Sequence, residues 1–336
     1  MRGQTTHILL TGATGYIGGS VLGHLLSHPL SDTFGTTILV RDQLKAKAFR
    51  TLGVKPVIGS NSDHALLQHL ASEADIVFAC ADADDLGAAE AILAGLKKRF
   101  EKTGTPPSLI HTSGTGVLVD DAQGMYATKT IYSDLDIEKL ESLPPTQPHR
   151  DVDLAIVAAD TQGYVKTYIV LPSTIYGIAS GALVDLGLQN AHSQQVPGLI
   201  KVSIDRGQGG MVGLGKNVWP HVHIREITDL YILLFDYILS HKPLAHGRQG
   251  FYFGENGEYT VYELAKAISE ALYHQGKAKS SKPSSFTEEE IKEYFPNGTM
   301  FGTNSRCKAE RARSLGWHPR KGHHDFLASV KAEISS

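Results

Sequence analysis

Cysteine is nearly absent from this chain of 336 residues, which contains only Cys80 and Cys307. Two cysteines so far apart exclude a disulfide framework, and they also exclude a cysteine-based zinc site. Cys80 lies in an apolar segment, where a thiol usually packs as a small hydrophobic group. We therefore expect no metal site, and this use of cysteine favours a cytosolic protein.

An excess of charge of one sign and long apolar runs are also missing. The chain has 32 Lys and Arg residues against 35 Asp and Glu residues, which gives a net charge of −3. Because so small a net charge produces no strong field, we expect no nucleic-acid partner and no anionic membrane partner. No apolar run reaches about 18 residues, which argues against a membrane-spanning helix. Strand-like sequence begins at His7, so we expect no secretory signal peptide.

Glycine, by contrast, is abundant, and three of its 34 residues fall in one motif directly after an apolar segment at residues 7–10. The motif reads Thr11-Gly12-Ala13-Thr14-Gly15-Tyr16-Ile17-Gly18. In a dinucleotide site, the first glycine permits a tight turn, the second lets a pyrophosphate approach the backbone, and the third lets the next helix pack on the sheet. We expect that helix to begin near Tyr16, with its free N–H groups facing the phosphates. The strand before the motif and the helical apolar pattern after it predict a dinucleotide-binding loop rather than a purely structural turn.

Strand-like and helix-like segments alternate from residue 7 to about residue 171. The strands are continuous apolar runs, which is typical of strands buried on both faces of a parallel sheet. We expect strands at Thr37–Val40, Pro56–Ile58, Asp75–Cys80, Ser108–His111 and Lys166–Leu171, with helices between them, including Ala65–Ala71 and Leu86–Phe100. This alternation predicts an α/β fold with a doubly wound parallel sheet and right-handed crossovers.

The pattern changes after Gly177. Residues 180–215 contain eight glycines and no long periodic segment, which indicates an insertion that caps the strand ends. Beyond it we expect further elements at Ile227–Leu239, at Gln249–Phe253, from Tyr259 onward and at Thr287–Tyr294. A chain of this length can form one large or two moderate domains. We predict a nucleotide-binding domain at residues 1–177 and a mainly substrate-binding lobe at residues 178–336, with some segments returning to the first domain.

Several segments together resemble the extended short-chain dehydrogenase/reductases, the NAD(P)-dependent epimerase/dehydratase-like family. The glycine motif is similar to the cofactor loop of that family, and the later segments follow in the family's order. These segments are residues 75–81, 110–116, 171–177, 221–230, 305–310 and 315–319. The resemblance covers nearly the whole chain. It implies a Rossmann sheet with a smaller C-terminal α/β substrate lobe, a nicotinamide cofactor and a small-molecule substrate, and it suggests a homodimer.

The resemblance also implies which residues contact the cofactor. From the glycine motif these are Gly12, Thr14, Gly15, Tyr16, Ile17 and Gly18. Three more residues at the end of the fourth strand, Ala79, Cys80 and Ala81, pass under the adenosine. At the sixth strand, Pro172, Ser173 and Thr174 meet the nicotinamide amide.

The residue after the second strand bears on the choice between NAD(H) and NADP(H). An NAD site usually places a carboxylate there for the ribose 2′-hydroxyl. Here the first residue is Arg41, whose guanidinium can bind a 2′-phosphate, and Lys45 can add a second positive charge. We therefore favour NADP(H). Two alternatives stay open: Arg41 and Lys45 are an ordinary solvated face, or Asp42 binds the ribose of NAD(H).

Working members of the family use a Ser or Thr, a Tyr and a Lys. The hydroxyl is available as Ser113, our first choice, or as Thr115, because both follow the fifth strand. The Tyr-Lys pair is missing, since His149 falls at the tyrosine position and Asp153 at the lysine position. The nearest match, Tyr126-Ala127-Thr128-Lys129, has one intervening residue too few and lies too early in the chain.

Three explanations compete for the missing pair. In the first, another residue donates the proton: histidine titrates near neutral pH, which makes His149 a candidate, and Tyr126, Tyr132 or Tyr176 can reach in from loops. In the second, the protein is a non-redox isomerase or epimerase. In the third, it is an NADP(H)-binding redox sensor without catalysis. Our preferred interpretation is an NADP(H)-dependent oxidoreductase that reduces a carbonyl or related group of a small organic molecule, although His149 can also be no more than a helix cap after a proline-rich approach.

Weaker candidates lie elsewhere in the chain. Asp82, Asp84 and Asp85 follow the fourth strand at the crevice where such sheets bind ligands. They can touch the substrate, although carboxylates in this place more often cap a helix. Residues 211–214 and Trp219 can line an apolar substrate pocket, or they can pack in the core.

Overall fold

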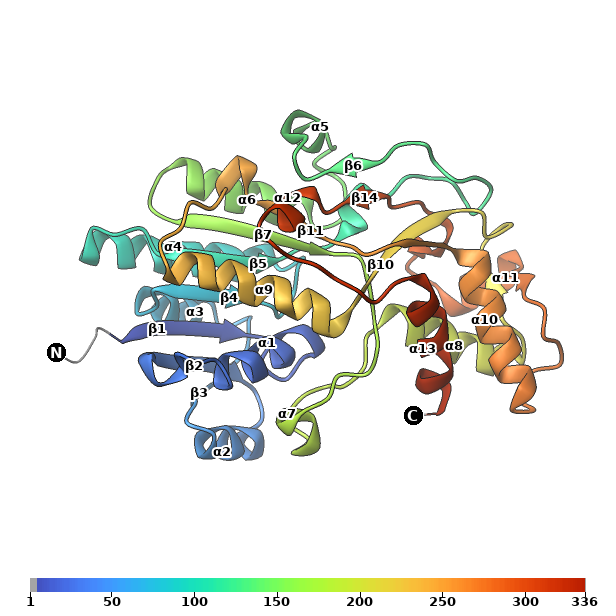
Figure 1. Ribbon diagram of the computed structural model, residues 1–336, viewed down its shortest axis with the longest axis horizontal. Helices are drawn as coiled ribbons and strands as arrows, with labels where there is room; N and C mark the ends of the chain where they lie inside the picture. The colour runs from blue at the N-terminus through green and yellow to red at the C-terminus, as the bar shows by residue number, and fades with distance from the viewer. Residues whose placement is uncertain (1–4, 336) are drawn as a thin grey trace.

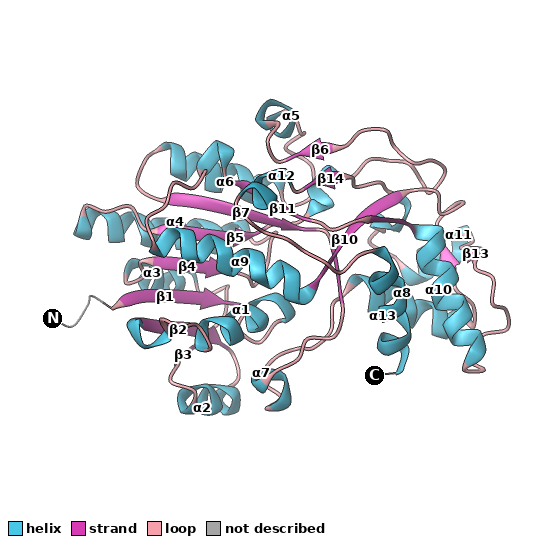
Figure 2. Cartoon of the chain, viewed as in Figure 1, coloured by secondary structure: helices cyan, strands magenta, loops and turns pink. Residues whose placement is uncertain are grey.

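A computed structural model describes residues 5–335, and its centre is a seven-stranded parallel sheet (Figures 1 and 2). The strand order is β11-β7-β5-β4-β1-β2-β3, so the direction of winding reverses between β1 and β4. The strands are β1 (Thr6–Thr11), β2 (Phe34–Val40), β3 (Lys55–Ile58), β4 (Ile76–Ala79), β5 (Ser108–Thr112), β7 (Lys166–Pro172) and β11 (Phe251–Gly254). This order confirms the predicted doubly wound sheet.

Helices cover both faces of the sheet. Helices α1 (Tyr16–Leu26) and α9 (Ile224–Leu239) lie side by side on one face. The other face carries α3 (His64–Ser72), α4 (Leu86–Thr103) and α6 (Arg150–Thr161), and α2 (Gln43–Thr51) connects β2 to β3 (Figure 1). Within residues 5–335, no helix is long and apolar enough to cross a membrane.

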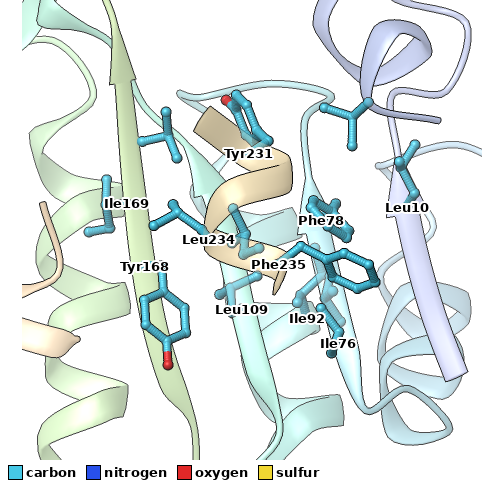
Figure 3. Packing of buried hydrophobic residues seen from close by; sticks show 14 of the residues in the cluster. Leu10, Ile76, Phe78, Ile92, Leu109, Tyr168, Ile169, Tyr231, Leu234 and Phe235 are labelled. Atoms are coloured by element: carbon cyan, nitrogen blue, oxygen red, sulfur yellow. The ribbon is translucent and has the colours of Figure 1, made fainter. Parts of the chain in front are cut away.

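The main core lies between α9 and the middle strands of the sheet (Figure 3). Phe235 of α9 packs its ring 5.6 Å from Phe78 of β4 and 5.2 Å from Phe34 of β2. Leu234 lies beside it, facing Leu109 of β5 (Figure 3). Burial of such side chains stabilises the fold by about 1.5–3 kcal/mol each. The core therefore ties α9, which comes late in the chain, to strands from its first third.

A second group of elements lies beyond the carboxyl ends of the strands, on the right of Figure 1. It contains a three-stranded sheet of β8 (Thr174–Tyr176), β10 (Val218–His223) and β12 (Glu258–Thr260). Around it are α8 (Gln195–Arg206), α10 (Val261–His274), α11 (Glu288–Tyr294) and α13 (His323–Ser335), which share a separate hydrophobic cluster. A capping box between Thr260 and Glu263 fixes the start of α10.

Shorter elements complete the chain. They are β6 (Tyr132–Ser133), β9 (Gly210–Met211), β13 (Ser284–Ser285), β14 (Cys307–Lys308), α5 (Ile137–Glu141), α7 (Ala182–Asp185), α12 (Glu310–Ser314) and 3₁₀ turns at Ser31–Thr33, Thr115–Leu118, Gly247–Gln249 and Met300–Gly302. The parallel pairs β6–β14 and β9–β13 each join segments that are far apart in the sequence. Two of these pieces, the turn at Thr115–Leu118 and the turn at Met300–Gly302, come close to the site described below.

One expectation was wrong. The segment at 180–215 does contain a long periodic element, because α8 has 12 residues. Its buried residues Val196, Leu199, Ile200 and Ser203 have helical spacing, but glycines on both sides of the helix obscure the pattern. Later segments also contribute to the main sheet region, since α9 packs beside α1 and β11 forms an edge of the main sheet.

Candidate active site

The glycine motif forms a tight loop between β1 and α1. Gly12 has φ +76°, and a Cβ added there would lie 2.6 Å from the carbonyl oxygen of Cys80. A Cβ at Gly18 would overlap the carbonyl oxygen of Gly12, so α1 could not pack so closely on the loop. Helix α1 begins at Tyr16, and no side chain caps it at Gly15. Its first N–H groups therefore remain available for an anion such as a pyrophosphate.

A cavity of about 760 Å³ opens beside this loop, at the carboxyl ends of the central strands. The predicted cofactor residues that line it are Gly15, Tyr16, Ile17, Cys80, Ala81, Pro172 and Ser173. They come from three different segments, which the winding reversal between β1 and β4 brings to one edge of the sheet. The cavity reaches from the α1 N-terminus to Ser113 and His149, which also line it.

The other predicted cofactor residues lie next to the cavity rather than in its lining. Gly12 and Thr14 belong to the loop, Gly18 lies in the first turn of α1, and Ala79 ends β4. The hydroxyl group of Thr174 is buried and hydrogen-bonded to Tyr259, so it faces the second sheet. The hydroxyl of Tyr16 donates to the carbonyl of Gly177, and burial raises the pKa of this phenol. Tyr16 therefore connects the loop to the end of β8 and is unsuited to proton transfer.

Arg41 and Lys45 lie at the end of β2, outside the cavity. Arg41 is exposed directly after the strand, and Lys45 lies in the first turn of α2. Asp42 between them caps α2, because its carboxylate accepts hydrogen bonds from the backbone N–H groups of Leu44 at 2.7 Å and Lys45 at 3.0 Å. These hydrogen bonds lower the pKa of Asp42. The carboxylate is thus used to start the helix, whereas Arg41 is free to face a ligand.

His149 is held in place by Asp84. Its Nδ1 lies 2.6 Å from Asp84 Oδ1, and its backbone N–H donates to the same oxygen at 3.0 Å. The residue adopts a left-handed conformation, φ 65°, at the start of α6, and its side chain makes no capping hydrogen bond. The other ring nitrogen, Nε2, lies beside Gly114 and Gly116, where an added Cβ would be 3.1 and 3.0 Å away. His149 therefore precedes the helix without capping it by its side chain, and its ring extends to the cavity.

Ser113 forms a second pair, with Asp153. Its hydroxyl donates to Asp153 Oδ2 at 3.1 Å, and the other carboxylate oxygen has no hydrogen-bond partner among residues 5–335. Complete burial raises the pKa of Asp153 to about 7, although Ser113 and Arg150 act in the opposite direction. Thr115, the second choice for the catalytic hydroxyl, is buried in the following 3₁₀ turn and does not line the cavity.

The tyrosine candidates do not line the cavity. Tyr126 is 51% exposed, and its carbonyl accepts a hydrogen bond from the Asn304 side chain. Tyr132 belongs to β6, and burial raises its pKa. Tyr176 is buried against aromatic rings of the second cluster. Trp219, considered for the substrate pocket, is likewise buried in that cluster, with Nε1 donating to the carbonyl of Thr303.

Sequence reasoning missed several parts of the site. Asp84 was weighed as a helix cap, but Asp85 caps α4, and Asp84 is left to bind His149. The strap at residues 190–195 also lines the cavity, where the Asn190 N–H donates to the carbonyl of Thr14 at 2.9 Å. So does the segment at 294–301, which belongs to the C-terminal part of the chain. No local motif marks these segments, since their role depends on how distant elements pack.

Comparison with known proteins gives matches along the whole chain. The model of the NmrA-like family matches residues 4–97. The chain is 31% identical to the oxidase ucsJ of an Acremonium species, over 94% of this chain and 93% of that protein. It is 26% identical to the uncharacterized protein C2A9.02 of Schizosaccharomyces pombe, over 68% of this chain and 70% of that one.

Solved structures with the same fold include sugar-nucleotide enzymes. A UDP-glucose 4-epimerase from Thermotoga maritima superposes with a TM-score of 0.66 at 15% identity, covering 98% of both chains. A dTDP-glucose 4,6-dehydratase from Bacillus anthracis, in complex with NAD, gives 0.66 at 16% identity, covering 98% of this chain and 97% of that one. At such identities these structures show the fold alone. Together with the full-length oxidase relative, they establish that the chain belongs to the extended short-chain dehydrogenase/reductase family and has the NAD(P)-binding scaffold of its oxidoreductases and epimerases.

Proposed function

We propose that the protein is an NADP(H)-dependent oxidoreductase that reduces a carbonyl or related group of a small organic molecule. The observation that carries this proposal is the His149–Asp84 pair, placed with Ser113 in a cavity that begins at the cofactor loop. The full-length relative named an oxidase supports redox chemistry on this scaffold.

The cavity has room for a nicotinamide and, next to it, for a substrate. The uncapped N-terminus of α1 would hold the pyrophosphate, and Pro172 and Ser173 would face the nicotinamide. When bound, the cofactor supplies the hydride. The chain's own residues must then hold the acceptor oxygen and give it a proton.

His149 is suited to be that proton donor. Asp84 accepts from Nδ1–H, which leaves Nε2 as the nitrogen that carries and releases the transferred proton. The carboxylate also stabilises the imidazolium form, as an acidic partner of histidine does in other acid–base pairs. With a histidine as the proton donor, no lysine is needed to lower the pKa of a phenol.

Ser113 would orient the acceptor oxygen, in cooperation with Asp153. When Asp153 is protonated, its O–H can donate to Ser113 Oγ, and the serine O–H is then free to donate to the substrate oxygen. The raised pKa of Asp153, about 7, keeps a substantial protonated fraction near neutral pH. The two pairs thus supply two donors at one place, His149 for the proton and Ser113 for a hydrogen bond.

Substitution of His149 tests the assignment. We expect His149→Phe to lower NADPH oxidation with a panel of aldehydes and ketones at least about a hundredfold, because general acid catalysis contributes that much. NADPH affinity, measured by fluorescence titration, should stay nearly the same, since the proposed role of His149 is toward the substrate oxygen and not toward the cofactor phosphates. His69→Phe, at an exposed position on α3, is the matched control.

Two results would contradict the proposal. A His149→Phe variant with full activity would remove His149 as the acid. Tight NADPH binding by the unaltered protein, with no turnover of any acceptor, would favour an isomerase or a redox sensor on the same scaffold.

A further inference from the structure

The cavity contains almost no formal charge. Among its lining residues, all of which lie in the described part of the chain, there is no lysine and no arginine, and Asp82 is the one acidic residue. Arg206, at the end of α8, already binds both carboxylate oxygens of Glu290, at 2.6 and 3.0 Å. A diphosphate in the substrate part of the cavity would find no lysine or arginine side chain, although phosphate recognition usually relies on them.

One wall of the cavity is apolar and partly aromatic. It is formed by Tyr294, Phe295, Met300 and Phe301 of the C-terminal part, with Val202 of α8 and Ile175 of β8. The Phe295 and Phe301 rings pack 5.8 Å apart at 60°, and Phe295 also contacts Phe286 at 5.5 Å. These contacts pack the wall against the second hydrophobic cluster, which fixes the positions of its side chains.

This wall begins at the proposed proton donor. An added Cβ at Gly116 would lie 3.0 Å from His149 Nε2 and 3.6 Å from Met300 Sδ, so the imidazole and the thioether are neighbours. Met300 is 44% exposed, so its thioether is accessible to a ligand in the cavity. Thioethers make favourable contacts with aromatic rings and adapt to their shape. A substrate whose oxygen accepts a proton from His149 would therefore place the neighbouring part of the molecule against this apolar wall.

Another part of the lining is polar. It consists of Asn190 and His192, whose Nδ1 lies 2.9 Å from Glu333 Oε2, and of Ser193, Gln194 and Gln195, where α8 begins. Pro197 lies in the first turn of α8 and has no N–H to donate, which weakens this helix end as an anion site. This part of the lining can hydrogen-bond a hydroxyl or carbonyl group at the far end of a neutral ligand.

The geometry points to a neutral, largely apolar substrate with a ring next to its reacting carbonyl, that is, an aryl ketone or a similar molecule, and not to a sugar nucleotide. The redox step rests on the function proposed above. The choice of ligand class does not, because it concerns binding alone.

Binding to the NADPH-saturated protein tests this inference. We expect calorimetry to show that 2-acetylnaphthalene binds at least about tenfold more tightly than UDP-glucose, because burial of its rings is favourable and a desolvated diphosphate stays unpaired. Met300→Lys should weaken 2-acetylnaphthalene about tenfold and strengthen the carboxylate 6-acetyl-2-naphthoate. Met300→Leu should leave both affinities nearly unchanged.

Met125→Lys is the matched control, because Met125 is similarly exposed, at 50%, and does not line the cavity. UDP-glucose binding as tight as that of 2-acetylnaphthalene, or unchanged ketone affinity in a folded Met300→Lys variant, would overturn the inference. If the neutral ketone binds preferentially but NADPH is never consumed, the proposed reaction fails while the ligand class stands. If NADPH is consumed with the 4-keto derivative of UDP-glucose and not with the aryl ketone, the ligand class fails while the reaction stands.

Discussion

Two aspartates support the candidate site, and their surroundings differ. Asp84 is well exposed and binds His149, whereas Asp153 is completely buried behind Ser113. Burial raises the pKa of Asp153 to about 7 because the ionised carboxylate loses its hydration. The sequence predicts Asp153 at the lysine position of the family's Tyr-Lys pair, where it would replace a fixed positive charge with a carboxyl group whose pKa is about 7.

The raised pKa makes stability depend on pH. Between about pH 4 and pH 7 the folded chain binds a proton at Asp153 that the unfolded chain has released, so this group's contribution to stability falls as pH rises through that range. Asp153→Asn removes the ionisation. Relative to the unaltered protein, we expect the variant to gain roughly 2–4 kcal/mol in unfolding free energy between pH 4 and pH 8. Urea unfolding of both proteins at pH 4 and at pH 8 measures this change. A difference in unfolding free energy between the two proteins that is the same at both pH values would contradict the expectation.

Arg41 decides the cofactor preference in our proposal. Arg41→Ala should weaken NADPH binding about ten- to a hundredfold, the usual effect of losing hydrogen bonds to a charged group. NADH binding should hardly change, since it has no 2′-phosphate. Arg50→Ala, at an exposed position in the last turn of α2, serves as the control. Equal weakening of both cofactors in a fluorescence titration would refute the assignment.

Residues of the site were predictable where they are neighbours in the sequence. The glycine loop is one continuous motif, and the structure places its residues at or next to the cavity. The pair of His149 and Asp84 spans 65 positions, and the pair of Ser113 and Asp153 spans 40. Such pairs form only when the start of α6 comes close to the segments that follow β4 and β5. No local sequence pattern predicts this contact.

At the scale of elements, α1 contains glycines with opposite roles. A Cβ at Gly18 would overlap the backbone of Gly12, whereas a Cβ at Gly23 would be 4.0 Å from its nearest neighbour, Leu183. We expect Gly18→Ala to destabilise the protein by about 1–3 kcal/mol and to weaken NADPH binding, because the loop must shift. Gly23→Ala should stabilise it by up to about 1 kcal/mol through helix propensity. Urea unfolding compares the two, and equal effects would contradict this account.

The elements of the main sheet were more predictable than those around it. Strands such as β4 and β5 are buried on both faces, which gives them continuous apolar sequences with clear ends. Helix α8 was missed because the glycines on both sides of it obscure its helical spacing. The wall at 294–301 was missed because it joins the end of a short helix to a 3₁₀ turn, and such segments carry no periodic pattern.

At the scale of the whole molecule, the cavity depends on two hydrophobic clusters that are separate from each other. The cofactor loop belongs to the sheet, and the apolar wall belongs to the second cluster. Phe326 of α13 is central to the second cluster, since its ring stacks on His221 at 4.9 Å and contacts Tyr259 at 4.4 Å. Damage to this cluster should therefore affect the substrate side first.

Phe326→Ala tests this separation. We expect a loss of about 3–5 kcal/mol in unfolding free energy, because a fully buried aromatic ring leaves a cavity behind. NADPH affinity should change little, whereas hydrogen exchange should increase in α10 and β10 before it does in β1 and β4. Leu327→Ala, at the half-buried neighbouring position, should cost less. Uniformly faster exchange across the chain would show that the two clusters do not act separately.

The late position of α9 and β11 in the chain has a consequence for synthesis. A nascent chain that ends before Ile224 has made six of the seven strands, but β7 is still an open edge, and the face that α9 covers is bare. Unpaired edges and exposed apolar faces are templates for association with other chains. While such chains remain on the ribosome, they should be good clients for chaperones that bind apolar segments, and this dependence should end once Gly254 has emerged.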